Sequence, residues 1–179
     1  MLRRHKTEEP IEPDYPTSRR LIIVDDLPEA GHLLGQLLRR VGYEVAEIGD
    51  HPTAINTLLD QPEPVAGVVA SFTTAGTSAG LRLVDAFRNH HRQELNTVRV
   101  LLISDQPRQQ IFCLQAGADA ILLRPFSGDE LVEATIAMIT RPESERVPYR
   151  RAMVAQVKQQ QTEESDGNLG PRSVAGQFV

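Results

Sequence analysis

The stretch Leu21-Ile22-Ile23-Val24-Asp25-Asp26 decides the fold. Four consecutive apolar residues run directly into two carboxylates, and a short apolar run bounded by polar residues is typical of a strand buried on both faces of a parallel sheet. In an open parallel sheet, function gathers beyond the carboxyl ends of the strands, which is where Asp25 and Asp26 lie. Adjacent carboxylates repel each other, so the pair predicts a nearby metal ion or basic side chain.

Four further apolar runs predict strands at 45–48, 65–70, 98–103 and 120–123. Amphipathic stretches between and after them predict helices that begin at Pro28, Pro52, Gly80, Pro107 and Ser127. Ser127 and Glu130 form a capping-box pattern at the start of the last of these helices. Strict alternation of five strands and five helices predicts an α/β, flavodoxin-like, doubly wound five-stranded parallel sheet of order 2-1-3-4-5.

Composition divides the chain into a domain and two flanking tails. Residues 1–20 contain three prolines among mixed charges and predict a disordered N-terminal tail. Residues 21–140 form the domain, and residues 141–179 form a linker and a C-terminal tail. Within that tail, Tyr149, Met153 and Val157 recur every four residues and indicate a short helix over 149–161. Two interpretations stay open: a helix that packs on its own domain or on a partner, and a mostly disordered tail.

Charge and hydropathy limit the classes of partner. The 179-residue chain has a net charge of −5, and residues 21–140 carry eight basic and fifteen acidic side chains, a net charge of −7. An acidic domain argues against direct nucleic-acid binding, and no DNA-binding domain fits within 141–179. No apolar run approaches the ~20 residues of a membrane span, so we expect no membrane contact. The single Cys113 suits a reducing compartment, and we expect a cytoplasmic location.

The order and spacing of several short motifs resemble a known family, the response-regulator receiver domains of two-component signalling. The resemblance covers residues 20–140. It rests on these motifs: Asp25-Asp26 after the first strand, Gly80-Leu81 opening the third helix, Ser104 after the fourth strand, Gly117-Ala118-Asp119 before the fifth strand and Arg124-Pro125-Phe126 after it. The resemblance implies a non-enzymatic signalling module whose activity depends on a phosphorylated site at the strand ends.

The chain departs from the family pattern at that site. The family has a phosphate-accepting aspartate at the end of the third strand, and the corresponding position here is Ala70, or Ser71 if the register shifts by one. No Asp or Glu occurs anywhere in 65–84. The family's lysine after the fifth strand is Arg124, and its switch aromatic is Ile121. An acyl phosphate needs a carboxylate nucleophile, so these departures predict a degenerate phosphorylation site.

The remaining site residues predict a cofactor-free arrangement. Asp25 and Asp26 could hold Mg²⁺ only weakly without a third carboxylate and a phosphoryl group. Arg124 offers a planar guanidinium that can bridge one or both carboxylates, and we favour this ion pair over bound metal. Ser104 is expected to cap the strand end or the next helix.

We therefore expect a pseudo-receiver that acts by protein–protein interaction with a signalling partner, including a second copy as a homodimer. One alternative is a phosphorylatable or Mg²⁺-dependent response regulator that uses Ser71 as acceptor. Another is a small-molecule sensor or enzyme with a ligand over Asp25, Ser71 and Ser104, which the fold alone does not exclude. The expected contact surface comprises Arg108, Gln109, Phe112 and Ile121, with Tyr149 and Met153 of the tail.

Overall fold

The computed structural model describes residues 13–60, 64–72 and 79–167. Its strands are β1 (Arg20–Val24), β2 (Glu44–Ile48), β3 (Gly67–Ser71), β4 (Val100–Ser104) and β5 (Ala120–Leu123). Its helices are α1 (Pro28–Arg40), α2 (His51–Asp60), α3 (Ala79–Arg88), α4 (Gln93–Asn96), the 3₁₀ turn η1 (Pro107–Gln109), α5 (Gln110–Ala116), α6 (Gly128–Thr140) and α7 (Glu143–Gly167).

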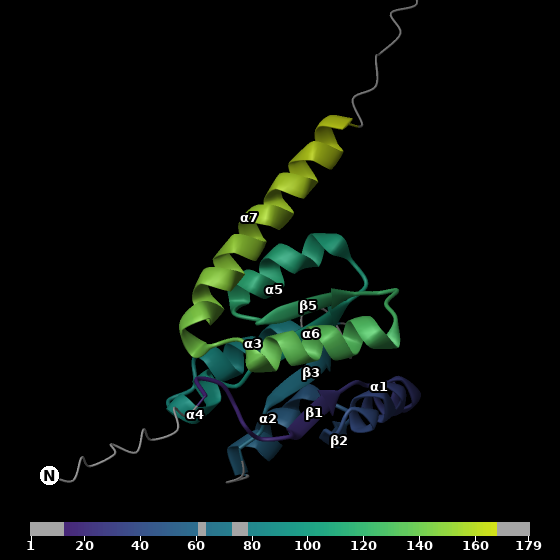
Figure 1. The fold of residues 1–179 in the computed structure, drawn as a ribbon, viewed down its shortest axis with the longest axis vertical. Helices are drawn as coiled ribbons and strands as arrows, with labels where there is room; N and C mark the ends of the chain where they lie inside the picture. The colour runs from purple at the N-terminus through teal and green to yellow at the C-terminus, as the bar shows by residue number, and fades with distance from the viewer. Residues whose placement is uncertain (1–12, 61–63, 73–78, 168–179) are drawn as a thin grey trace, which may run out of the picture.

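The five strands form one parallel sheet of order β2-β1-β3-β4-β5, which confirms the predicted topology. Helices cover both faces of this sheet (Figure 1). Because side chains alternate across a strand, each strand contributes to two separate cores. Val24, Val68 and Leu102 pack towards α2, α3 and α5, whereas Ile23, Val69 and Leu101 pack towards α1 and α6. The central strands β1, β3 and β4 are therefore buried on both faces, as their continuous apolar runs indicate.

The sequence predicted five helices in the domain and a short helix in the tail. The described residues contain seven α-helices, α7 being the tail helix. The helix predicted from Pro107 divides into η1 and α5, and α4 is a four-residue helix that carries too few positions to show a period. The capping box of Ser127 and Glu130 is present at the start of α6. No helix within the described ranges combines the length and apolar character needed to cross a membrane.

The tail helix differs most from the sequence prediction. Instead of a short helix over 149–161, α7 begins at Glu143 and includes Pro148 as its sixth residue. The acidic first turn, with Glu143 and Glu145, stabilises the helix start through the helix dipole. A proline this close to the N-terminus removes only one backbone hydrogen bond, so the two prolines of 141–148 do not mark an extended linker.

Part of the predicted N-terminal tail also contacts the domain. The carbonyl of Asp14 accepts a hydrogen bond from the backbone N–H of Glu143 at 3.0 Å, and the Ser18 hydroxyl donates to the carbonyl of Pro64 at 2.8 Å. The rest of that tail, residues 1–12, and the predicted C-terminal end, 168–179, lie outside the described residues.

The buried Asp119 carboxylate joins α7 to the amino edge of the sheet. Asp119 precedes β5, is 1% exposed, and accepts a hydrogen bond from the backbone N–H of Val100 at 2.9 Å. Three guanidinium groups bind the same carboxylate: Arg88 of α3 at 2.9 Å, Arg146 of α7 at 2.8 and 2.9 Å, and Arg150 of α7 at 2.9 Å. Burial opposes ionisation of Asp119, but hydrogen bonds and charge from Arg146 and Arg88 hold the pKa of this carboxyl below its ordinary value of 3.8.

A depressed folded-state pKa gives Asp119 a stabilising contribution that is present above the unfolded-state pKa and is lost as pH falls through the folded-state value. We therefore expect the free energy of unfolding of the wild type to fall below about pH 4. Asp119→Asn should reduce stability at neutral pH by about 3–5 kcal/mol, because it leaves buried guanidinium groups without their counter-ion. It should also flatten the acid part of the pH profile. Urea unfolding between neutral and acid pH measures both effects, with the exposed Glu133→Gln as control, and parallel profiles for Asp119→Asn and wild type would contradict the account.

Candidate functional site

The carboxyl ends of four strands bring together the polar residues that the sequence singled out. Asp25 follows β1, Ser71 is the last residue of β3, Ser104 is the last residue of β4, and Arg124 follows β5. The strands are parallel and neighbouring, with Val24 beside Ala70, Ser71 beside Ile103, and Ser104 beside Leu123. These side chains therefore lie at one edge of the sheet, as expected from the strand-end rule.

Asp25 lies at the centre of this group and has only 4% of its surface exposed. Its Oδ1 accepts a hydrogen bond from the backbone N–H of Leu27 at 3.0 Å, and its Oδ2 accepts a hydrogen bond from the hydroxyl of Ser71. A buried carboxylate is costly unless it is hydrogen-bonded or paired with a cation. Both of its oxygens are therefore already bound within the protein.

The Arg124 guanidinium supplies the cation. Its Nη2 donates to Ser71 Oγ at 3.2 Å and lies 3.6 Å from Asp25 Oδ2, while its Nη1 lies 3.5 Å from Asp105 Oδ1. The Arg124 backbone N–H donates to the Ser104 carbonyl at 2.9 Å, which fixes the start of the side chain at the sheet edge. One guanidinium thus serves two carboxylates and the Ser71 hydroxyl, a geometry that suits the fork of arginine.

The structure shows which residue occupies the position at the end of the third strand. Ala70 is fully buried in the core that packs towards α2, α3 and α5. Ser71 instead directs its hydroxyl towards Asp25 and Arg124. Of the two registers that the sequence left open, the geometry therefore places Ser71 at the site.

Ser104 belongs to the same strand edge but binds elsewhere. Its hydroxyl donates to Oε1 of Gln109 and accepts the backbone N–H of Gln106 at 3.2 Å. These bonds hold the turn between β4 and η1, so Ser104 caps the strand end. Among the described residues, the partners of its hydroxyl are Gln106 and Gln109 rather than Asp25 or Arg124.

Asp26 and His51 extend the site on its other side. The Asp26 side chain is exposed, whereas Asp25 is buried, so the two carboxylates point into different environments. His51, the first residue of α2, is 5% exposed. Burial lowers the pKa of His51 below its ordinary value, although a hydrogen bond to the Ser71 backbone and the charge of Asp26 act in the opposite direction. No local pattern pointed to His51, because its neighbour Ser71 is twenty residues away in the sequence.

The residues predicted to form one contact surface fall into two groups. Phe112 on α5 is 61% exposed, and Arg108 on η1 is exposed and donates to the Gln106 side chain at 2.8 Å. Ile121 instead lines a small cavity together with Tyr149 and Met153 of α7. The tail stripe is therefore packed against its own domain, and Phe112 lies outside that contact.

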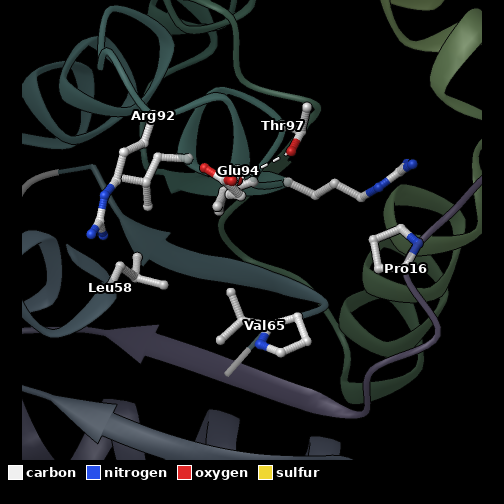
Figure 2. Close-up of a pocket in the computed structure, with 10 residues that line it drawn as sticks. Pro16, Leu58, Val65, Arg92, Glu94 and Thr97 are labelled. Carbon is white, nitrogen blue, oxygen red and sulfur yellow. Dashed lines mark hydrogen bonds between the residues drawn. The ribbon is translucent and has the colours of Figure 1, made fainter. Parts of the chain in front are cut away.

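Two larger cavities flank the sheet. One, of about 530 Å³, lies at the amino edge, where Pro16, Val65 and Arg99 precede β1, β3 and β4 (Figure 2). Figure 2 also shows Arg92 and Glu94 at this cavity. The other, also of about 530 Å³, lies between α2 and α3 and includes His51 and Arg82. The amino-edge cavity is at the opposite end of the strands from Asp25.

A family model for the response regulator receiver domain matches residues 21–136. The chain belongs to this family. A search of curated proteins found no relative of this receiver.

Solved structures share the fold of this receiver. A protein of Chloroflexus aurantiacus described as a response regulator is 25% identical, with a TM-score of 0.62, over 69% of this chain and 99% of that one. The receiver domain of a sensor histidine kinase of Pseudomonas aeruginosa, with a magnesium ion in its active-site cleft, is 21% identical, with a TM-score of 0.60, over 69% and 99% of the chains. The chemotaxis response regulator CheY4 of Vibrio cholerae is 18% identical, with a TM-score of 0.60, over 68% and 99%.

The contacts of Asp25 leave this carboxylate poorly suited to bind a magnesium ion at the strand ends. Mg²⁺ needs oxygen ligands that are free to coordinate it, usually one or two carboxylates with water and phosphate oxygens. Here both Asp25 oxygens accept hydrogen bonds, and the Arg124 cation lies 3.6 Å from one of them. In the part of the chain that the structure describes, no group of three or more His, Cys, Asp or Glu side chains is placed to hold a metal.

We expect Arg124→Ala to lower the free energy of unfolding by about 1–3 kcal/mol, because it removes the cation beside a buried carboxylate and one bond to Ser71. Arg124→Lys keeps the charge but not the fork, so it should recover only part of this loss. Arg108→Ala is the matched control, since Arg108 is exposed and its side-chain bond within the described residues is to the neighbouring Gln106. Chemical denaturation measures all three, and an equal loss for Arg124→Ala and Arg108→Ala would contradict the role of Arg124.

Proposed function

We propose that this receiver is a non-enzymatic protein-interaction module that is not switched by aspartyl phosphorylation. One observation carries the proposal: the residue at the end of β3 that faces the site is Ser71, and its hydroxyl donates to Asp25. Formation of an acyl phosphate requires a carboxylate nucleophile. The only carboxylate buried at the site, Asp25, is bound by a hydroxyl, a backbone N–H and a guanidinium among the described residues.

The charge balance of the site supports the same conclusion. A phosphorylatable site must accommodate a large change in negative charge, which a metal ion normally offsets. In this receiver, the Arg124 guanidinium supplies a positive charge beside Asp25. The buried Asp25 carboxylate is thus neutralised by a side chain of the same site, and we infer that the chain presents one standing surface to its partner.

The proposed partner is another protein of a signalling pathway or a second copy of this chain. Exposed aromatic and arginine side chains are favoured anchors of protein interfaces. Phe112, 61% exposed on α5, and the nearby Arg108 on η1 offer such a pair. The net charge of −7 over residues 21–140 argues against nucleic acid as the partner.

A second candidate function is phosphorylation of Ser71 itself, and one contact favours it. Asp25 Oδ2 accepts the Ser71 hydroxyl bond, which is the geometry of a general base beside a nucleophile. In such a step, Ser71 Oγ would form the bond to phosphorus, its proton would pass to Asp25, and the bond from phosphorus to the donor's leaving group would break. Ser71 is only 3% exposed, so a phosphate donor would have to open the site first.

Incubation with acetyl phosphate and Mg²⁺ distinguishes a receiver that is not phosphorylated from one that is phosphorylated on Ser71. We expect the intact mass of the full chain to stay unchanged, while a phosphorylatable receiver treated in parallel gains one phosphoryl group. Ser71→Ala provides the matched control.

A gain that disappears in Ser71→Ala and resists hydroxylamine would support the second candidate and overturn the first. A gain that persists in Ser71→Ala and is cleaved by hydroxylamine would reveal an acyl phosphate on another carboxylate, and would contradict both.

A further inference from the structure

Helices α2 and α3 contact each other on one face of the sheet and leave between them a cavity of about 530 Å³, here called the α2–α3 cavity. Each helix lines it with residues three and four positions apart, which lie on one helix face. These residues are Pro52, Ile55 and Asn56 of α2, and Ala79, Arg82 and Leu83 of α3.

The α2–α3 cavity has an apolar floor and a polar rim. Leu83 is fully buried, Ala79 is 5% exposed, and Ile55 is half-buried, so these side chains form the floor. Asn56 and Arg82 are exposed and lie at the rim. A concave site of this size, with apolar walls and a small number of polar groups, is typical of the sites that bind small molecules.

The polar groups of the rim are free to bind a ligand. The Arg82 guanidinium and the Asn56 amide have no hydrogen-bond or ion-pair partner among the described residues. The Asp50 carboxylate also lines the cavity, but its two oxygens accept hydrogen bonds from the backbone N–H and the hydroxyl of Thr53 at 2.8 and 2.7 Å. The rim therefore carries one cation that its own carboxylate does not neutralise.

His51 lies between the α2–α3 cavity and the strand-end site. It lines the cavity, is 5% exposed, and forms a hydrogen bond with the Ser71 backbone. Burial, together with the charge of Arg82, lowers the pKa of His51 below its ordinary value of 6.5, so its imidazole is neutral at neutral pH. Arg82, and not His51, thus supplies the positive charge of the cavity.

The amino-edge cavity has the same volume but offers less to an anion. Its two arginines already donate to backbone carbonyls, Arg92 to Leu59 at 2.7 Å and Arg99 to Met138 at 2.9 Å. Glu94 adds a negative charge there. Of the two large cavities, the α2–α3 cavity is therefore the one that suits an anionic ligand.

We propose that the α2–α3 cavity binds a small organic carboxylate with an apolar body. The carboxylate binds the Arg82 guanidinium, whose planar fork matches its geometry, and accepts a hydrogen bond from the Asn56 amide. The apolar body packs on Ile55 and Leu83, a surface that an inorganic anion would leave uncovered. This inference goes beyond the proposed function and holds whether or not Ser71 is phosphorylated, because the cavity lies beside the strand-end site.

Titration of the isotope-labelled full chain with 2-naphthoate and with octanoate, followed by ¹H–¹⁵N NMR, tests an aromatic and an aliphatic body. We expect at least one of these carboxylates to cause saturable shifts of the Ile55, Asn56 and Arg82 amides. The matching neutral amide, naphthamide or octanamide, should bind at least about tenfold more weakly, because it lacks the charge that Arg82 recognises. Acetate, which has no apolar body, should cause only the shifts that NaCl also causes.

Two variants with matched controls assign the binding to this cavity. Arg82→Ala should weaken binding of the carboxylate about tenfold or more and leave the affinity for the neutral amide unchanged. Asn56→Trp should obstruct the cavity and weaken binding of both. Arg40→Ala on α1 and Glu133→Trp on α6 are substitutions at exposed positions on the other face of the sheet, and should leave both affinities unchanged.

Three results would overturn the proposal. The first is the absence of saturable shifts at Ile55, Asn56 and Arg82 with both carboxylates. The second is equal affinity of the carboxylate for the wild type and Arg82→Ala, or equal affinity of the wild type for the carboxylate and the neutral amide. The third is shifts confined to Asp25 and Ser71, which would place the ligand at the strand ends. The comparison of carboxylate with amide uses the wild type alone, so it does not depend on the folding of any variant.

Discussion

The candidate site depends on one requirement, which is that the buried carboxylate of Asp25 be neutralised. Asp25 directly follows the strand β1 and has 4% of its surface exposed. Leu27, Ser71 and Arg124 meet this requirement with a backbone N–H, a hydroxyl and a guanidinium. Two consequences follow: both Asp25 oxygens already accept hydrogen bonds within the protein, and Ser71 is held as a hydrogen-bond donor. The same three contacts that stabilise the strand edge thus define what the site is able to do.

A second buried carboxylate, that of Asp119, is also neutralised by guanidinium groups, at the opposite edge of the sheet. Its partners come from α3, β4 and α7, so it ties the tail helix to the domain. The buried carboxylates at the two edges therefore serve different parts of the structure. One edge carries Asp25, Ser71 and Arg124. The other fixes α7, whose apolar residues Tyr149, Met153 and Val157 line a small cavity with Ile121 of β5.

Much of the fold was predictable, because it depends on local patterns. Continuous apolar runs identified the buried strands, and the strand-end rule brought Asp25, Ser71, Ser104 and Arg124 to one edge. Two features were not predictable. The sequence alone did not decide whether Ala70 or Ser71 lies at the site, because a run of small residues does not define the end of β3. The start of α7 was hidden by Pro142, just before the helix, and by Pro148 within it. The contact of Arg146 with Asp119 joins residues 27 positions apart, which no local pattern reveals.

The central claim is that the Asp25 carboxylate at the strand ends is neutralised by Arg124 and does not recruit Mg²⁺. Titration of the isotope-labelled full chain with Mg²⁺, followed by ¹H–¹⁵N NMR, tests this most directly. The account predicts that the amide resonances of Asp25, Asp26 and Ser71 stay in place up to millimolar Mg²⁺, apart from uniform ionic-strength effects matched by NaCl. Saturable shifts confined to these residues would show that Mg²⁺ displaces Arg124, and would contradict the account.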